Sequence, residues 1–273
     1  MIVVTGATGN VGRPLVQALV DAGEKVTAVS RRPSHVPDGV EAVAGDLLRP
    51  HTLAQAVSGA QALFLLTSAD VHGAAADLDA VLEVARDGGV RRVVLLSSIG
   101  VASGRHPSGL EDSVTASGLE WTLLRPGAFA TNDLAWAEPV RTARTVPTPF
   151  PDVAVPVVDP ADIADVAAAV LLGEGHAGRT YEITGPSPVS PRERVAAIGA
   201  ALGEQVRLVE QTRAEAKAQM LGFMPEPVVE ATLGALGEPT PAEQRVSPDV
   251  ERVLGRAARA YAEWAGRNVA AFR

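Results

Sequence analysis

Cysteine is absent from the 273-residue sequence, and several other residue types are scarce. Without cysteine the chain can form no disulfide bond, thiolate nucleophile, CxxC redox pair or thiolate-ligated zinc site. The five histidines are scattered along the chain, so we expect no metal site. Lysine occurs only at Lys25 and Lys217, and the remaining basic residues are arginines. The composition therefore excludes cysteine-based chemistry and argues against a metalloenzyme.

Positive charge is not in excess, because 24 Lys and Arg residues stand against 32 Asp and Glu and give a formal net charge of −8. Binding to nucleic acid or to an anionic membrane surface requires clustered basic residues, so we expect neither partner. No apolar run approaches the roughly 18 residues of a transmembrane helix. Met1–Val4 lead directly into a glycine-rich turn without the regions of a signal peptide, and we expect a cytoplasmic protein.

The sequence does contain an alternation of short Val-, Leu- and Ile-rich runs with alanine-rich helical stretches through residue 185. This alternation is typical of βαβ units around a parallel sheet. The predicted strands are Ile2–Val4, Lys25–Val29, Glu41–Ala44, Ala62–Leu66, Arg92–Leu96, Trp121–Arg125 and Tyr181–Ile183, with a short extra strand at Val155–Val158. The predicted helices are about Val11–Ala22, Thr52–Val57, Gly73–Arg86, Gly109–Ala116 and Pro160–Leu172.

After Gly185 the strand signals fade and the chain becomes helical, ending in a predicted alanine-rich helix at Asp249–Trp264. Asp159-Pro160 and Ser190-Pro191 each place a capping residue before a proline, which is typical of a helix start. The sequence thus predicts an α/β fold: a doubly wound parallel sheet in residues 1–185, and a smaller, mostly helical C-terminal lobe in residues 186–273 packed on the substrate side.

The first predicted strand ends in a glycine-rich turn of the pattern G-x-x-G-x-x-G. Gly6 permits the tight turn, Gly9 lets the backbone approach a pyrophosphate, and Gly12 allows the helix to pack closely on the strand. The alternative is an ordinary glycine-rich turn with no ligand. The position between a clear strand and a clear helix favours dinucleotide binding. The predicted cofactor residues of this turn are Gly6, Thr8, Gly9, Asn10, Val11 and Gly12.

Further motifs extend along nearly the whole chain. They are T-G-A-T-G-N-V-G at 5–12, G-D-L at 45–47, L-S-S-I-G at 96–100, S-G-L-E-W-T-L-L-R-P-G at 117–127, V-D-P-A-D-I-A at 158–164 and Y-E-I-T-G at 181–185. Together they resemble the atypical short-chain dehydrogenase/reductases, and within them the NmrA-like proteins, which include quinone reductases. The resemblance implies a Rossmann sheet whose cofactor nicotinamide points to the carboxyl ends of the strands, under the C-terminal lobe.

The resemblance also implies roles for matched positions. It places Asp46 and Leu47 beside the adenine, Thr67 and Ser68 beside the ribose or nicotinamide, and Ser97 and Ser98 near the reactive ring, where we expect them to donate hydrogen bonds that orient the acceptor. At each position the alternative is a strand-end residue that caps the next helix.

The end of the second predicted strand bears on the choice of dinucleotide. An acidic residue there would hold the ribose 2′-OH of NAD, whereas arginine accommodates the 2′-phosphate of NADP. The sequence has Arg31 and Arg32 at this point and no acidic residue in the stretch. The alternative is a pair of solvated surface arginines. We expect the cofactor to be NADP(H) rather than NAD(H).

The usual proton donor of short-chain reductases, a tyrosine followed four residues later by a lysine, is absent, because Tyr181 and Tyr261 are followed by glycine and alanine. His106 and Glu111 resemble the H-x-x-x-E region of NmrA-like quinone reductases, with one additional residue between them. His106 can titrate near neutrality and is a candidate acid. The alternatives are a surface histidine and a glutamate that caps or solvates its helix.

The predicted acceptor pocket is lined by Phe129 and Asn132 and, from the lobe, by Met220, Phe223 and Met224. Each can equally belong to the core. We expect an NADPH-dependent reductase that transfers hydride to a quinone-like or other activated small molecule. A non-catalytic NADP(H)-binding sensor and a redox-neutral enzyme of secondary metabolism on the same fold remain alternatives. The substrate and the oligomeric state do not follow from the sequence.

Overall fold

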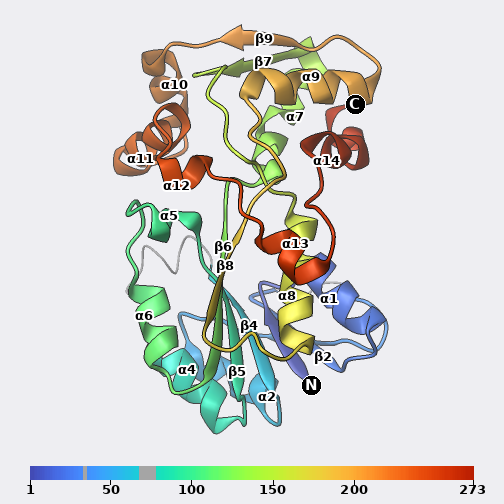
Figure 1. Ribbon diagram of the computed structural model, residues 1–273, viewed down its shortest axis with the longest axis vertical. Helices are drawn as coiled ribbons and strands as arrows, with labels where there is room; N and C mark the ends of the chain where they lie inside the picture. The colour runs from blue at the N-terminus through green and yellow to red at the C-terminus, as the bar shows by residue number, and fades with distance from the viewer. Residues whose placement is uncertain (33–35, 68–77) are drawn as a thin grey trace.

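The computed structural model of the protein describes residues 1–32, 36–67 and 78–273 (Figure 1). Its centre is a seven-stranded parallel sheet in the order β3-β2-β1-β4-β5-β6-β8. The strands are β1 (Ile2–Thr5), β2 (Val26–Ser30), β3 (Glu41–Ala44), β4 (Ala62–Leu66), β5 (Arg92–Leu96), β6 (Glu120–Pro126) and β8 (Arg179–Ile183). The order reverses between β1 and β4, so the predicted doubly wound Rossmann sheet is confirmed.

Helices cover both faces of this sheet, because neighbouring strand residues point to opposite sides. Val4 and Val94 pack in one core cluster with α1 (Gly12–Asp21) and α8 (Pro160–Leu172). Val3 and Val93 pack in the other, with α2 (Ala54–Val57), α4 (Leu78–Asp87) and α6 (Gly109–Ala116). A short helix, η1 (Pro50–Leu53), leads into α2. The central strands β1, β4 and β5 are buried on both faces, which explains their apolar sequences, whereas the edge strand β3 is mostly exposed.

A second layer lies above the carboxyl ends of the strands (Figure 1). Its two-stranded parallel sheet joins β7 (Thr145–Thr148) to β9 (Arg207–Glu210). Around a third core cluster pack η2 (Ala130–Trp136), α7 (Ala137–Ala143), α9 (Pro191–Leu202), α14 (Tyr261–Arg267) and η3 (Val269–Phe272). The layer therefore takes segments from both sides of residue 185, and the predicted division of the chain at that residue stays a prediction.

Five helices that the structure describes remain. They are α5 (Ile99–Ala102) after β5, α10 (Arg213–Met220), α11 (Glu226–Gly237) and α12 (Pro241–Gln244) in the upper layer, and α13 (Asp249–Leu254), which packs on α8. Among the described residues no helix combines the length and the hydrophobicity that a bilayer crossing requires.

Two predicted elements are wrong. Val155–Val158 is not a strand: Val155 and Val158 make only isolated bridges, to Val189 and Phe129, because Pro156 between them has no N–H for a ladder. The single helix predicted at Asp249–Trp264 is instead α13 and α14. Gly255 ends α13 in the left-handed conformation, with φ +67°.

Carboxylates of α8 fasten this broken C-terminal segment to the sheet domain. Asp162 is fully buried and accepts hydrogen bonds from the backbone N–H of Arg259 at 2.7 Å and from its Nη1 at 2.5 Å. Arg256 Nη1 lies 2.8 Å from the same carboxylate. Asp165 pairs with both arginines, at 2.5 and 2.9 Å. The V-D-P-A-D-I-A motif thus has a structural role, and we name Asp162, Asp165, Arg256 and Arg259 the α8 clamp.

Candidate active site

The glycine-rich turn between β1 and α1 adopts the geometry expected of a phosphate-binding loop. Gly6 has φ +62°, a conformation that suits glycine. A Cβ on buried Gly12 would lie 2.2 Å from the Gly6 carbonyl oxygen, so only glycine lets α1 approach the strand. Gly9 is exposed, and a Cβ there would meet only that same oxygen, at 3.2 Å. Val11 at the N-terminus of α1 provides no side-chain cap, so the helix can offer N–H groups to an anion.

A cavity of about 210 Å³ opens beside this turn. It lies at the carboxyl ends of β1, β2 and β4, where an open α/β sheet binds its ligand. Its lining includes six of the predicted cofactor residues: Gly6, Thr8, Gly9, Arg31, Asp46 and Leu47. The remaining lining residues are Thr5, Val29, Ser30, Gly45, Leu48, Leu53 and Leu66. The cavity therefore lies where an open α/β sheet of this kind binds a nucleotide, between the turn and the end of β2.

One of the predicted cofactor residues, Asp46, has a structural role as well. The Asp46 carboxylate accepts from Leu48 N at 3.1 Å and pairs with Arg49 Nε at 3.2 Å, which fixes the loop after β3. Arg31 is exposed and lines the cavity, and Arg32 beside it is also exposed. Thr67 follows β4 directly, and Ser68 lies outside the described residues.

The end of β5 carries a side-chain network that sequence analysis did not identify. Ser97 donates a short hydrogen bond to Oε1 of Glu111 on α6. Glu111 is only 5% exposed, and Arg125 at the end of β6 holds it with two hydrogen bonds, of 2.9 and 2.5 Å. This contact raises the pKa of the Arg125 guanidinium. Glu111 therefore neither caps nor solvates its helix, and the arginine within L-L-R-P-G was the available signal, since a buried strand end holds an arginine only with a partner.

Ser98 differs from Ser97. It is the N-cap of α5, and its Oγ accepts a hydrogen bond from the Gly100 N–H at 3.0 Å. The alternative reading of this residue as a helix cap is therefore correct, and its hydroxyl proton stays available to a ligand. The catalytic roles predicted for Ser97 and Ser98 stay predictions.

His106 lies on the exposed side of α5. Its backbone N–H donates to the Gly100 carbonyl at 2.9 Å, and its ring packs so closely on Gly100 that a Cβ there would lie 2.4 Å from Nδ1. The next residue toward the N-terminus, Arg105, reaches the upper layer, where its Nε lies 2.9 Å from Glu243 of α12. The loop that bears His106 is thus tied to the helices above the sheet.

The residues predicted to line the acceptor pocket do not share one environment. Phe129 packs partly buried against the first core cluster, and Asn132 is exposed on η2. Met220 and Met224 pack with Phe150 and with buried residues of α10 and α11, whereas the Phe223 side chain is 68% exposed. The structure does not bring these five side chains into either of the two cavities described here, and the acceptor pocket stays a prediction.

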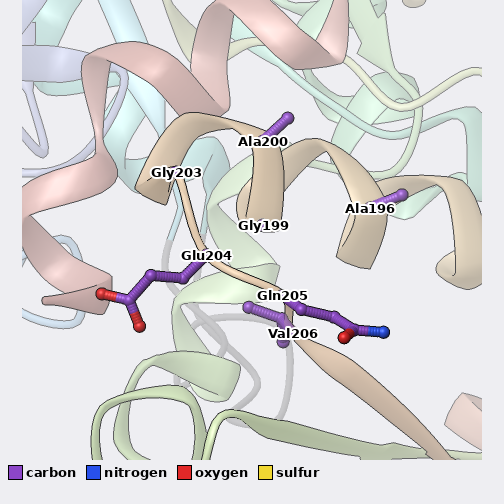
Figure 2. A pocket seen from close by; sticks show the side chains of 7 residues that line it. All are labelled: Ala196, Gly199, Ala200, Gly203, Glu204, Gln205 and Val206. Carbon is purple, nitrogen blue, oxygen red and sulfur yellow. The ribbon is translucent and has the colours of Figure 1, made fainter.

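A second hollow, of about 480 Å³, lies far from this edge of the sheet, at the end of α9 (Figure 2). Its walls are Ala196, Gly199, Ala200, Gly203, Glu204, Gln205 and Val206. The one charged side chain among them, Glu204, already pairs with Arg144 at 2.6 Å. Figure 2 shows no converging polar groups there, so the hollow is larger than the first cavity but lacks the chemistry of an active site.

Known proteins and a family model match the chain along most or all of its length. A family model described as NAD(P)H-binding matches residues 6–174. The chain is 37% identical to a (4-alkanoyl-5-oxo-2,5-dihydrofuran-3-yl)methyl phosphate reductase of Streptomyces griseus and 35% identical to an NAD(P)H azoreductase of Xenophilus azovorans, in each case over 100% of this chain and 99% of the relative.

Solved structures share the fold. A triphenylmethane reductase of Citrobacter sp. superposes with a TM-score of 0.83 at 22% identity, covering 98% of this chain and 99% of that chain. NmrA, a negative transcriptional regulator solved in complex with NADP, superposes with a TM-score of 0.76 at 18% identity, covering 97% and 94%. The predicted resemblance to the NmrA-like proteins is confirmed, and so is the expectation of an NAD(P)H-dependent oxidoreductase. With its phosphate-binding turn, its cavity and these relatives, the chain belongs to the NAD(P)H-binding family of Rossmann-fold proteins.

Proposed function

We propose that the protein is an NADPH-dependent reductase that transfers hydride to a conjugated, electron-poor small molecule such as a quinone or an enone. The bound nicotinamide supplies the hydride, and the proton comes from water. The chain holds the nucleotide at the turn between β1 and α1, and Ser97, Ser98 and His106 belong to the acceptor side of the site.

The observation that carries this proposal is the position of the two tyrosines, since neither can act as the acid of a ketone reductase. Tyr261 is buried in the upper layer, where its hydroxyl donates to Asp133 at 2.7 Å, and burial raises its pKa far above the usual range. Tyr181 is on β8, and its hydroxyl oxygen lies 2.8 Å from Nδ1 of His176, which is in the loop before this strand. An acceptor that delocalises the negative charge of its product needs no strong acid, whereas an unactivated ketone does.

The relatives support an activated acceptor. The name of the Streptomyces griseus relative describes an unsaturated lactone ring that carries an alkanoyl group, and the Xenophilus azovorans relative is named for azo reduction. The first name denotes a conjugated carbonyl system, and the second denotes an N=N double bond. Both relatives are named as reductases, and both match this chain over its full length. They therefore favour a reductase over a non-catalytic sensor and over a redox-neutral enzyme.

The test is NADPH oxidation by the purified protein with a panel of quinones, enones, azo compounds and unactivated ketones. We expect turnover with the conjugated acceptors and little with the ketones. His106→Ala should lower the rate by much less than the roughly 10²–10⁴-fold loss typical of a general acid. His51→Ala, at an exposed histidine on η1, is the matched control.

Efficient ketone reduction would show that a strong acid is present and would refute the mechanism. Tight NADPH binding without turnover of any acceptor would favour the sensor or the redox-neutral enzyme instead.

A further inference from the structure

The two serines at the end of β5 differ in the hydrogen-bonding capacity that they have left for a ligand. Ser97 directs its proton to Glu111. A carboxylate accepts hydrogen bonds but has none to give, and a guanidinium only donates, so the pair of Glu111 and Arg125 leaves Ser97 no other arrangement. The one proton of the Ser97 hydroxyl is therefore committed, and its oxygen can still accept.

Burial makes this arrangement firm. Glu111 is 5% exposed and Arg125 shows 22% of its side chain, whereas Ser97 is only half-buried at the sheet edge. Turning the Ser97 proton toward a ligand would leave a buried carboxylate oxygen with one hydrogen bond fewer, in a region where water replaces it poorly. Ser98 has the opposite character, because its oxygen accepts from the Gly100 N–H and its proton is available.

We propose that Glu111, held by Arg125, is a positioning residue that fixes Ser97 as a hydrogen-bond acceptor, so that the bound ligand presents an N–H or O–H donor to Ser97 Oγ. Of these two serines, Ser98 is then the one that can donate to an acceptor oxygen. This inference deepens the proposed function, since it rests on Ser97 lying in the same site, and it reverses for Ser97 the donor role that the sequence suggested.

Two ligands of this site can supply such a donor: the carboxamide N–H of the nicotinamide, or a hydroxyl or amino group on the acceptor. The first arm of the test compares the dissociation constants of NADP⁺ and of its 3-acetylpyridine analogue, which has no amide N–H. We expect the wild type to bind NADP⁺ about five- to tenfold more tightly, which is the effect of one hydrogen bond.

The variants Ser97→Ala and Glu111→Gln should bring this ratio toward one. Glu111→Gln is the sharper of the two, because it keeps the serine hydroxyl while its amide N–H can donate to Ser97 Oγ, so that the serine proton no longer has to point to residue 111. It also removes the negative charge that pairs with Arg125. A merely structural role of Glu111 would weaken both nucleotides equally. Ser117→Ala, which removes a hydroxyl that donates to the Val114 carbonyl at the end of α6, is the matched control and should keep the wild-type ratio.

The second arm measures binding of a hydroxyquinone and of its methyl ether to the protein loaded with NADP⁺, with the same variants. A preference for the hydroxyquinone that disappears in Ser97→Ala and Glu111→Gln identifies the acceptor as the source of the donor. A change in the nucleotide ratio identifies the carboxamide. The proposal is overturned if neither ratio differs between the wild type and folded Ser97→Ala. Both arms measure binding at equilibrium, so a lack of turnover, which would refute the proposed function, leaves them interpretable.

Discussion

The glycines of the phosphate-binding turn allow a prediction that separates cofactor binding from folding. Gly9 and Gly12 are three residues apart, yet an added methyl group meets different surroundings at each. At Gly12 the new Cβ would lie 2.2 Å from the Gly6 carbonyl oxygen and 2.7 Å from the Ala7 Cα. These are backbone atoms, so the turn or α1 must move. At Gly9 the nearest atom lies at 3.2 Å, and Gly9 lines the cavity that we propose for the cofactor.

Gly12→Ala should therefore lower the free energy of unfolding by about 1–3 kcal/mol or more, the usual cost of overpacking. For a chain of this size that corresponds to a fall in Tm of about 2–4 °C per kcal/mol. Gly9→Ala should keep Tm within a few degrees of the wild type. The same overpacking cost, now falling on the complex, should weaken NADPH binding by roughly 5- to 150-fold.

The assays are thermal unfolding without nucleotide and a titration of NADPH against intrinsic fluorescence. The reasoning is refuted if Gly9→Ala binds NADPH as tightly as the wild type, or if Gly12→Ala unfolds at the wild-type temperature. The first result would mean that the turn has only a structural role, and the second that α1 can move away from β1 without cost.

Three further predictions concern charge. Arg31→Ala should weaken NADPH binding by about 10- to 100-fold in direct titrations and leave NADH binding nearly unchanged. The reason is that a charge-assisted hydrogen bond to the 2′-phosphate is worth about 1.5–3 kcal/mol. Equal loss of affinity for both nucleotides would contradict this prediction. Asp162→Asn should lower the free energy of unfolding, measured by chemical denaturation, by about 3–5 kcal/mol, because it leaves Arg259 and Arg256 with a neutral partner. Asp165→Asn should lower it by less than about 1 kcal/mol, because a third of the Asp165 side chain is exposed. Burial, and to a smaller extent the charges of Arg92 and Arg179, lowers the pKa of His176. As the pH drops through about 6.5, the unfolded chain takes up a proton at this histidine before the folded chain does, so the free energy of unfolding should fall. Melting curves of His176→Asn should lack this pH dependence.

The sheet was predictable because its strands carry their own signal. β3, β4 and β5 begin and end at the predicted residues. For β4 and β5 the reason is that buried parallel strands are apolar runs bounded by polar turns, whereas β3 is a mostly exposed edge strand. The Ser190 capping box and the Asp159 cap were likewise local and are confirmed.

The missed elements depend on distant partners. β7 contains Pro147, and β9 begins with Arg207 and ends with Glu210, so neither has the apolar pattern of a strand. They form because each gives the other a backbone ladder across about sixty residues of chain. Gly255 was readable as a helix end, but the apolar pattern on both sides of it favoured one long helix.

The candidate site also contains both local features, which the sequence predicts, and contacts between distant residues, which it does not. The glycine-rich turn is contiguous in the sequence, so its backbone geometry could be predicted by position alone, and its role in binding the cofactor stays a prediction. The contact of Glu111 with Ser97 and Arg125 joins residues that are each 14 positions from it, on different elements. Burial decides whether a glutamate on α6 is solvated or paired, and the sequence near residue 111 does not reveal that the helix turns this side chain toward the sheet.

The α8 clamp has a consequence for how the protein responds to alkaline conditions. All of its cations are guanidinium groups, which stay protonated at any pH that a protein survives. A lysine in the same place would begin to lose its charge near pH 10 and loosen the C-terminal segment. Because Arg256 and Arg259 cannot do so, the junction between the two layers keeps its charge balance throughout the alkaline range. A loss of activity between neutral pH and about pH 10 would therefore not come from loss of charge on these two arginines.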